Sequence, residues 1–155
     1  MKHTKFLFLT KEIIEYGQQG IPYGLINSVK FIIKKLEQLN ILSNHISVTN
    51  HSLINSHIVQ HKPENVIIEA LWLSPRELHE LSLIHPNVNF MVRLHSDTPF
   101  LASETDAVDY IRGYLKYKRR GCKISIASND KRLVEDLCGI FGKNSIEYMP
   151  DIYDI

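Results

Sequence analysis

Six short apolar runs, separated by amphipathic segments, constrain the fold of this chain more than any other feature of its sequence. The runs are Lys5–Thr10, His45–Asn50, Asn65–Trp72, Asn89–Leu94, Cys122–Ser128 and Ser145–Met149. Most of them are almost continuously apolar, which is typical of parallel strands covered by helices on both faces rather than of half-exposed hairpins. The runs therefore predict six strands.

The segments between these runs carry the period and the end signals of helices. A stripe of apolar residues spaced by three and four follows the first run, namely Leu25, Val29, Ile32, Leu36 and Leu39. Ser74 and Glu77 match a capping box, with Pro75 at the first helical position. Asp130 predicts the start of a later helix, and Gly142 predicts its end in a left-handed conformation.

This alternation predicts an α/β fold with an open, mostly parallel, Rossmann-like sheet. We expect about six strands with helices on both faces, a three-layer α/β/α arrangement. The strand order expected first is 3-2-1-4-5-6, and the alternative is a five-stranded flavodoxin-like order. A length of 155 residues fits one domain over residues 1–155.

Composition argues against several classes of function. The chain has 18 Lys+Arg against 17 Asp+Glu and a formal net charge of +1, which gives no electrostatic footprint for nucleic acid. No apolar run approaches the roughly 20 residues of a membrane span, and no secretory signal is evident. Cys122 and Cys138 form neither a disulfide framework nor a CxxC pair. We therefore expect a reduced, cytoplasmic protein with no nucleic-acid partner and no membrane span.

Candidate site residues follow from the predicted sheet. Ligands of open α/β sheets bind outside the C-terminal ends of the strands, where helix N-termini point their free N–H groups. The residues near those ends are Gly17, Gly20 and Gly24 after the first strand, Asn50 and His51 after the second, Glu69 and Trp72 at the third, His95, Ser96, Asp97, Thr98 and Pro99 after the fourth, Ser128, Asn129 and Asp130 after the fifth, and Pro150 and Asp151 after the sixth. These residues make up the predicted substrate-binding edge.

His95 is the candidate catalytic residue at this edge. A histidine that ends a buried strand could act as a base or bind a sugar hydroxyl, because its ordinary pKa lies near the working pH. The alternative is a structural histidine that caps the next turn. Glu69 interrupts an apolar strand, and a buried carboxylate is costly without a partner. We expect Glu69 to lie near the exposed end of its strand or to pair with Arg93 on the neighbouring strand.

No cofactor and no metal are predicted. The glycines between Lys11 and Gly24 permit close approach of a ligand, or serve only as a flexible connection. Their spacing is not GxGxxG, and a Walker A motif is absent, so a nicotinamide cofactor is not supported. His57 and His61 are four residues apart, but no third metal ligand follows at a clear spacing.

Five stretches that together span most of the chain resemble one known family. They are GIPYGLINSVKFIIKKLEQL (20–39), VIIEALWLSPREL (66–78), HPNVNFMVRLHSDTPFLASE (85–104), IASND (126–130) and YMPDIY (148–153). They are similar to the N-terminal half of glycosyltransferase-like proteins of the GT-B fold, above all the uncharacterised ones of bacteria and their phages. The EALW and VRLHSDTPFLA stretches are the specific part of this resemblance.

The resemblance implies the acceptor-side domain of a retaining glycosyltransferase that uses a nucleotide sugar as substrate and needs no bound metal. Gly20 and Gly24 would face the inter-domain cleft, His95 would contact the transferred sugar, and Ser96–Thr98 would line the acceptor side. The donor-binding domain of such enzymes has no counterpart in this sequence. We therefore expect a second chain that supplies it, or a homo-oligomer. The alternative is a non-catalytic protein that keeps the fold to bind a ligand or a protein partner.

Overall fold

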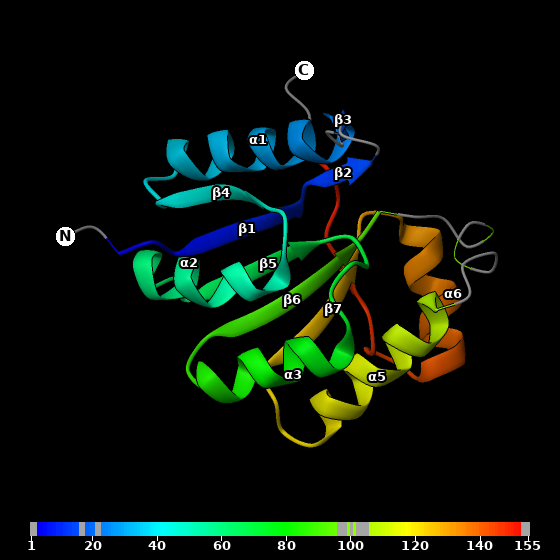
Figure 1. The fold of residues 1–155 in the computed structure, drawn as a ribbon. Helices are drawn as coiled ribbons and strands as arrows, with labels where there is room; N and C mark the ends of the chain where they lie inside the picture. The colour runs from blue at the N-terminus through cyan, green and yellow to red at the C-terminus, as the bar shows by residue number, and fades with distance from the viewer. Residues whose placement is uncertain are drawn as a thin grey trace.

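Six parallel strands form the central sheet (Figure 1). In chain order they are β1 (Phe6–Lys11), β4 (Ser43–Val48), β5 (Asn65–Glu69), β6 (Asn89–Leu94), β7 (Ile124–Ser128) and β8 (Glu147–Tyr148). The computed structural model describes residues 3–15, 18–20, 23–95, 99, 101 and 106–152. The predicted fold class is confirmed, and each of the six apolar runs contains or overlaps a strand.

The strand order differs from the one expected first. The sheet runs β4-β1-β5-β6-β7-β8, which is 2-1-3-4-5-6 when these strands are numbered along the chain. This is the flavodoxin-like alternative with a sixth strand added, and the order 3-2-1-4-5-6 is wrong. Burial explains the difference, because four of the five residues of β5 are buried whereas β4 is mostly half-exposed. The more apolar strand lies inside the sheet, and the more polar one forms its edge.

Two of the helices begin at the capping residues that the sequence indicates. The described helices are α1 (Tyr23–Gln38), α2 (Ile54–His61), preceded by a 3-10 turn over His51–Leu53, α3 (Pro75–Ile84), α5 (Ala107–Arg119) and α6 (Lys131–Phe141). The capping box of Ser74 and Glu77 is present, and Asp130 accepts hydrogen bonds from two backbone N–H groups of α6. Gly142 ends α6 with a φ of 113°. Within the described part of the chain, no helix is long and apolar enough to cross a membrane.

The two faces of the sheet are covered unequally. The connection from β1 to β4 moves in one direction along the sheet, and all later connections move in the other. Because such crossovers are right-handed, α1 packs on the opposite face from the later helices. Val29 and Ile32 of α1 pack on Phe8 and Ile67, whereas α2, α3, α5 and α6 contribute to one larger core on the other face. Figure 1 shows α1 alone above the sheet among the described helices. The α1-side face is therefore only partly covered by helix.

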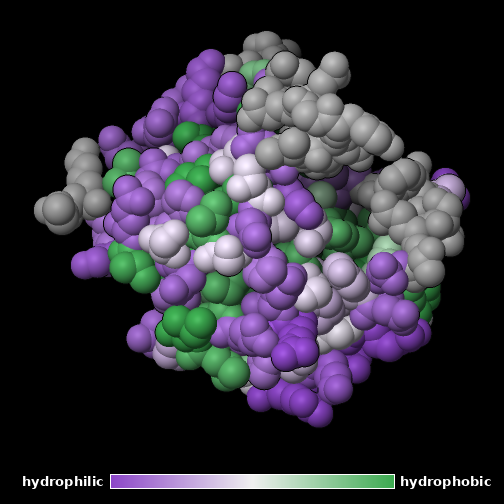
Figure 2. Space-filling model, in the orientation of Figure 1, coloured by the Kyte–Doolittle hydropathy of each residue, from purple (hydrophilic) through white to green (hydrophobic). Residues whose placement is uncertain are grey.

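Two short strands that the sequence did not predict lie between β1 and α1. A glycine-containing loop is expected there, but Ile13–Glu15 (β2) and Gln18–Gly20 (β3) pair as an antiparallel ribbon. On the side of the molecule seen in Figure 2, apolar side chains form small separate patches among polar ones. The broad apolar packing lies inside, between the sheet and its helices.

Candidate functional site

Polar side chains from neighbouring strand ends form a connected group, which we call the strand-end network. Its members are Glu69, Arg93, His95, Asn129, Asp151 and Ser28. Glu69 ends β5 and lies in register with Arg93 of β6, while His95 and Asn129 directly follow β6 and β7. Ser28 comes from α1, and Asp151 follows β8. The network lies at the sheet edge where the sequence predicts a ligand.

A buried ion pair is the centre of this network. The Nη1 atom of Arg93 lies 3.3 Å from both carboxylate oxygens of Glu69, and both side chains are 0% exposed. The predicted pair between these residues is confirmed. On its other side, Nη2 of Arg93 lies 2.5 Å from the Oδ1 atom of Asp151. Two carboxylates thus flank the guanidinium, and this matters because a buried charge without partners is strongly destabilising.

Asp151 joins the C-terminal segment to the sheet and to α1. Its carboxylate accepts a hydrogen bond from the Ser28 hydroxyl and another, at 2.8 Å, from the Asn129 amide. Burial alone would raise the pKa of Asp151. The hydrogen bonds from Ser28 and Asn129 and the charge of Arg93 outweigh that effect and hold this pKa below its ordinary value. Asp151 is therefore a carboxylate whose ionised form the fold stabilises.

His95 is held from both sides of its ring. Its Nε2 atom contacts a carboxylate oxygen of Glu69, which can only accept, so Nε2 carries the hydrogen of this bond. Its Nδ1 atom lies 3.5 Å from the amide nitrogen of Asn129, whose orientation is set by the bond to Asp151. Nδ1 is therefore the acceptor nitrogen. The contact to Asn129 is at the upper limit for a hydrogen bond, so Nδ1 is the least committed atom of the ring.

The sequence predicted that Trp72 ends a strand, but it lies three residues beyond the end of β5. β5 ends at Glu69 because Ala70 adopts a positive φ of 73°, which takes the chain out of the sheet. The N–H group of Ala70 still donates to the carbonyl of Arg93 at 2.8 Å. The indole N–H of Trp72 turns back and donates to the carbonyl of Glu69 at 2.8 Å. Trp72 thus supports the end of β5 and does not belong to the network itself.

The other predicted site residues lie in several different places. Ser128 is buried, and its hydroxyl accepts from the N–H of Asp130 at 3.1 Å in the turn before α6. Gly24 lies in the first turn of α1, and Gly20 ends β3. Four predicted residues lie outside the described part of the chain, namely Gly17, Ser96, Asp97 and Thr98. Among the predicted residues, the structure brings Glu69, His95, Asn129 and Asp151 together.

A second polar group, which the sequence analysis missed, lies near the same edge. The Thr10 hydroxyl lies 2.8 Å from Nε2 of His45 and 2.9 Å from the hydroxyl of Ser47. Burial and the nearby charge of Lys30 lower the pKa of His45, and the charge of Glu69 opposes this only in part. The available signal was the alternation along β1 and β4, since Thr10 and Ser47 are in register.

The network suits hydrogen bonding to a ligand better than nucleophilic chemistry. His95 and Asp151 keep 14% and 15% of their side chains exposed, whereas Glu69 and Arg93 have no exposed surface. The exposed tips are an imidazole and a carboxylate, with the Asn129 amide between them, and such groups bind hydroxyls in defined directions. In the described part of the chain, no group of three or more His, Cys, Asp or Glu could hold a metal ion.

Comparisons with known proteins agree with the fold and show no family. The sequence matches no protein-family model and no curated protein. A family 3 carbohydrate esterase of Clostridium thermocellum is similar in structure, with a TM-score of 0.51, 14% identity and coverage of 80% of this chain and 77% of the esterase. A GDP-L-fucose synthetase of Naegleria fowleri matches with a TM-score of 0.43 and 10% identity over 83% of this chain and 51% of the synthetase.

The likeness to the esterase bears on the architecture only. At 14% identity, the likeness to the esterase supports the Rossmann-like open sheet and does not extend to its activity. The chain spans about half the length of the synthetase. The resemblance to GT-B glycosyltransferases stays a prediction.

Proposed function

We propose that this protein binds a sugar-bearing ligand at the C-terminal edge of its sheet, as the acceptor-side domain of a glycosyltransferase-like assembly. The strand-end network is the observation that carries this proposal. It presents polar tips to solvent on a fully buried ionic base formed by Glu69 and Arg93. Sugar hydroxyls both donate and accept, so they match a site that offers an amide donor beside imidazole and carboxylate acceptors.

The residues of the network have different tasks in this proposal. Nδ1 of His95 accepts from a ligand hydroxyl, which replaces the weak 3.5 Å contact with Asn129. The amide of Asn129 stays fixed by its 2.8 Å bond to Asp151 and contacts the same ligand. Glu69 and Arg93 are positioning residues, because they are fully buried and hold the His95 ring and the Asp151 carboxylate in place. The segment that contains Ser96, Asp97 and Thr98 follows His95 directly and would form the acceptor side.

Transfer itself needs groups beyond this network. Glycosyl transfer depends on holding donor and acceptor together. We propose that a second chain, or a second copy of this one, supplies the donor-binding groups. The alternative is a non-catalytic protein that binds its ligand at the same edge. One observation favours that alternative, namely that both ring nitrogens of His95 already have partners in the network.

Isothermal titration with nucleotide sugars and the corresponding free sugars tests this proposal. We expect heat of binding with at least one member of a panel that includes UDP-glucose and GDP-mannose. Asn129→Ala should weaken that binding by about tenfold, as expected for the loss of one hydrogen bond to a ligand. The matched control is Asn87→Ala, at an exposed position before β6, at the other end of the sheet. The absence of heat with every ligand, or equal effects of the two variants, would contradict the proposal.

A further inference from the structure

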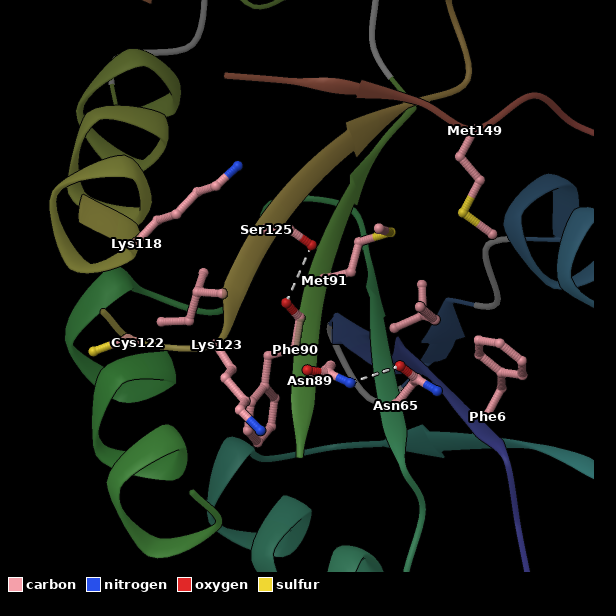
Figure 3. Close-up of a pocket in the computed structure, with 12 residues that line it drawn as sticks. Phe6, Asn65, Asn89, Phe90, Met91, Lys118, Cys122, Lys123, Ser125 and Met149 are labelled. Carbon is pink, nitrogen blue, oxygen red and sulfur yellow. Dashed lines mark hydrogen bonds between the residues drawn. The ribbon is translucent and has the colours of Figure 1, made fainter. Parts of the chain in front are cut away.

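The α1-side face of the sheet carries a groove away from the strand-end network. Its volume is about 400 Å³, which lies in the range of small-molecule sites. Phe6, Ile67, Met91 and Met149 provide its apolar surface, and Lys118 and Cys122 lie on the α5 side. Figure 3 shows Phe6 and Met149 on one side of this space and Lys118 on the other, with Met91 between them. The strand order explains the groove, because α1 packs on β1 and β4 and leaves the next strands open.

The polar groups in the floor of the groove are satisfied within the protein. The Asn89 amide donates to the Asn65 side chain at 3.2 Å, and the Ser125 hydroxyl contacts the carbonyl of Phe90 at 3.5 Å (Figure 3). They therefore do not require a polar ligand. Methionine side chains adapt to irregular apolar shapes, so Met91 and Met149 can pack against a flexible chain. The floor of the groove suits an alkyl chain.

Positive charge lies along one side of the same groove. Lys118 extends from α5, and Lys123 lies immediately before β7. Neither lysine has an acidic partner among the ion pairs of the described residues, whereas Lys5 is paired with Glu64. The two amino groups point toward opposite ends of this side (Figure 3), so an anion there would contact one lysine and lie within the field of the other. Charge and shape together thus define a ligand with an apolar body and an acidic end.

We propose that this groove binds a fatty-acid anion. The alkyl chain lies over Ile67, Met91 and Met149, and the carboxylate lies against the amino group of Lys118, with Lys123 as a second cation on the same side of the groove. This site is separate from the strand-end network and does not depend on the function proposed for it. It adds a lipid-like ligand on the partly covered face of the sheet.

Titration of the full chain with dodecanoate, below its micelle concentration, tests the site. We expect saturable binding of dodecanoate by calorimetry, and no comparable binding of dodecyltrimethylammonium, which has the same alkyl chain and the opposite charge. The double variant Lys118→Gln/Lys123→Gln should weaken dodecanoate binding by about tenfold, since one ion pair and a second positive charge on the same side are lost. The matched control, Lys131→Gln/Lys143→Gln, removes the same charge at exposed positions of and after α6 and should bind as the wild type does.

A third variant locates the alkyl chain. Met91→Glu places a negative charge on the floor of the groove and should abolish dodecanoate binding, while circular dichroism shows whether the fold is kept. If Met91→Glu folds and still binds, the ligand lies elsewhere and the proposal is wrong. Equal binding of the two detergents would also overturn it. The proposal would also be wrong if sedimentation showed that the wild type is a dimer and that Met91→Glu dissociates it, because a second copy of the chain would then occupy the groove.

Discussion

Two adjacent pairs of residues on one face of the sheet differ completely in chemistry. Ile67 is in register with Met91, and two residues further along the same strands Glu69 is in register with Arg93. Because side chains alternate along a strand, both pairs point to the α1 side. The first pair lines an open groove, and the second is a fully buried ion pair. A step of two residues therefore separates an adaptable apolar surface from a fixed polar one.

The difference between these regions lies in how their interactions are satisfied. The groove is lined by apolar side chains, and contacts between apolar surfaces are non-directional and tolerate changes in shape. The strand-end network depends on directional hydrogen bonds that Arg93 donates to two carboxylates and a hydroxyl oxygen. Removal of one member leaves the others buried without partners. We therefore expect substitutions in the network to cost far more stability than comparable substitutions in the groove.

Arg93→Met is expected to have the largest effect. It keeps much of the side-chain volume but leaves Glu69 buried and without its cation, and it removes the charged partner of Asp151. Breaking a buried ion pair in this way costs about 3–5 kcal/mol. Urea unfolding followed by circular dichroism measures the change. The double variant Arg93→Met/Glu69→Gln should recover part of the loss, because it removes the uncompensated charge, and equal stability of the single and double variants would contradict the role of the pair.

Asp151→Asn is expected to have a smaller effect that depends on pH. The pKa of Asp151 is lowered from 3.8 in the folded protein, so its stabilising contribution is complete above that value and is lost as the pH falls through the folded value. At neutral pH, loss of a charge-assisted hydrogen bond costs about 1.5–3 kcal/mol. Wild type and variant should therefore differ in stability at pH 7, and this difference should shrink as the pH is lowered in steps below 4. Unfolding curves measure it, and a constant difference at every pH would contradict the assignment.

The sequence was a good guide to the elements and a poorer guide to their arrangement. Apolar runs and capping residues such as Ser74 and Asp130 are local signals, so they predict where strands and helices lie. The position of β5 beside β1 depends on which strand is the better buried, and this is a property of the whole sheet. The end of β5 was missed because Ala70 carries no local sign of its positive φ.

The candidate site shows the same limit. The pairing of Glu69 with Arg93 could be predicted, because each interrupts an apolar run and a buried charge requires a partner. Asp151 could be placed at the correct edge as a residue that follows a strand. Its contact with Ser28 could not be predicted, since 123 positions separate the two in sequence and no spacing pattern links them. The groove depends on which face each crossover takes, so it appears only once the strand order is known.

Met91→Ala should have the smallest effect and tests the other side of the comparison. Met91 lies against the open groove, so its truncation loses packing on one side only, and we expect a cost of about 1 kcal/mol. Leu94→Ala is the matched variant on the same strand, because Leu94 is 1% exposed and packs into the core of the opposite face. Its truncation should cost about 2–5 kcal/mol. Urea unfolding of both variants, at several protein concentrations, measures the difference. Equal costs would mean that the groove is covered in solution, and the contrast between an open apolar surface and a closed polar network would then be wrong.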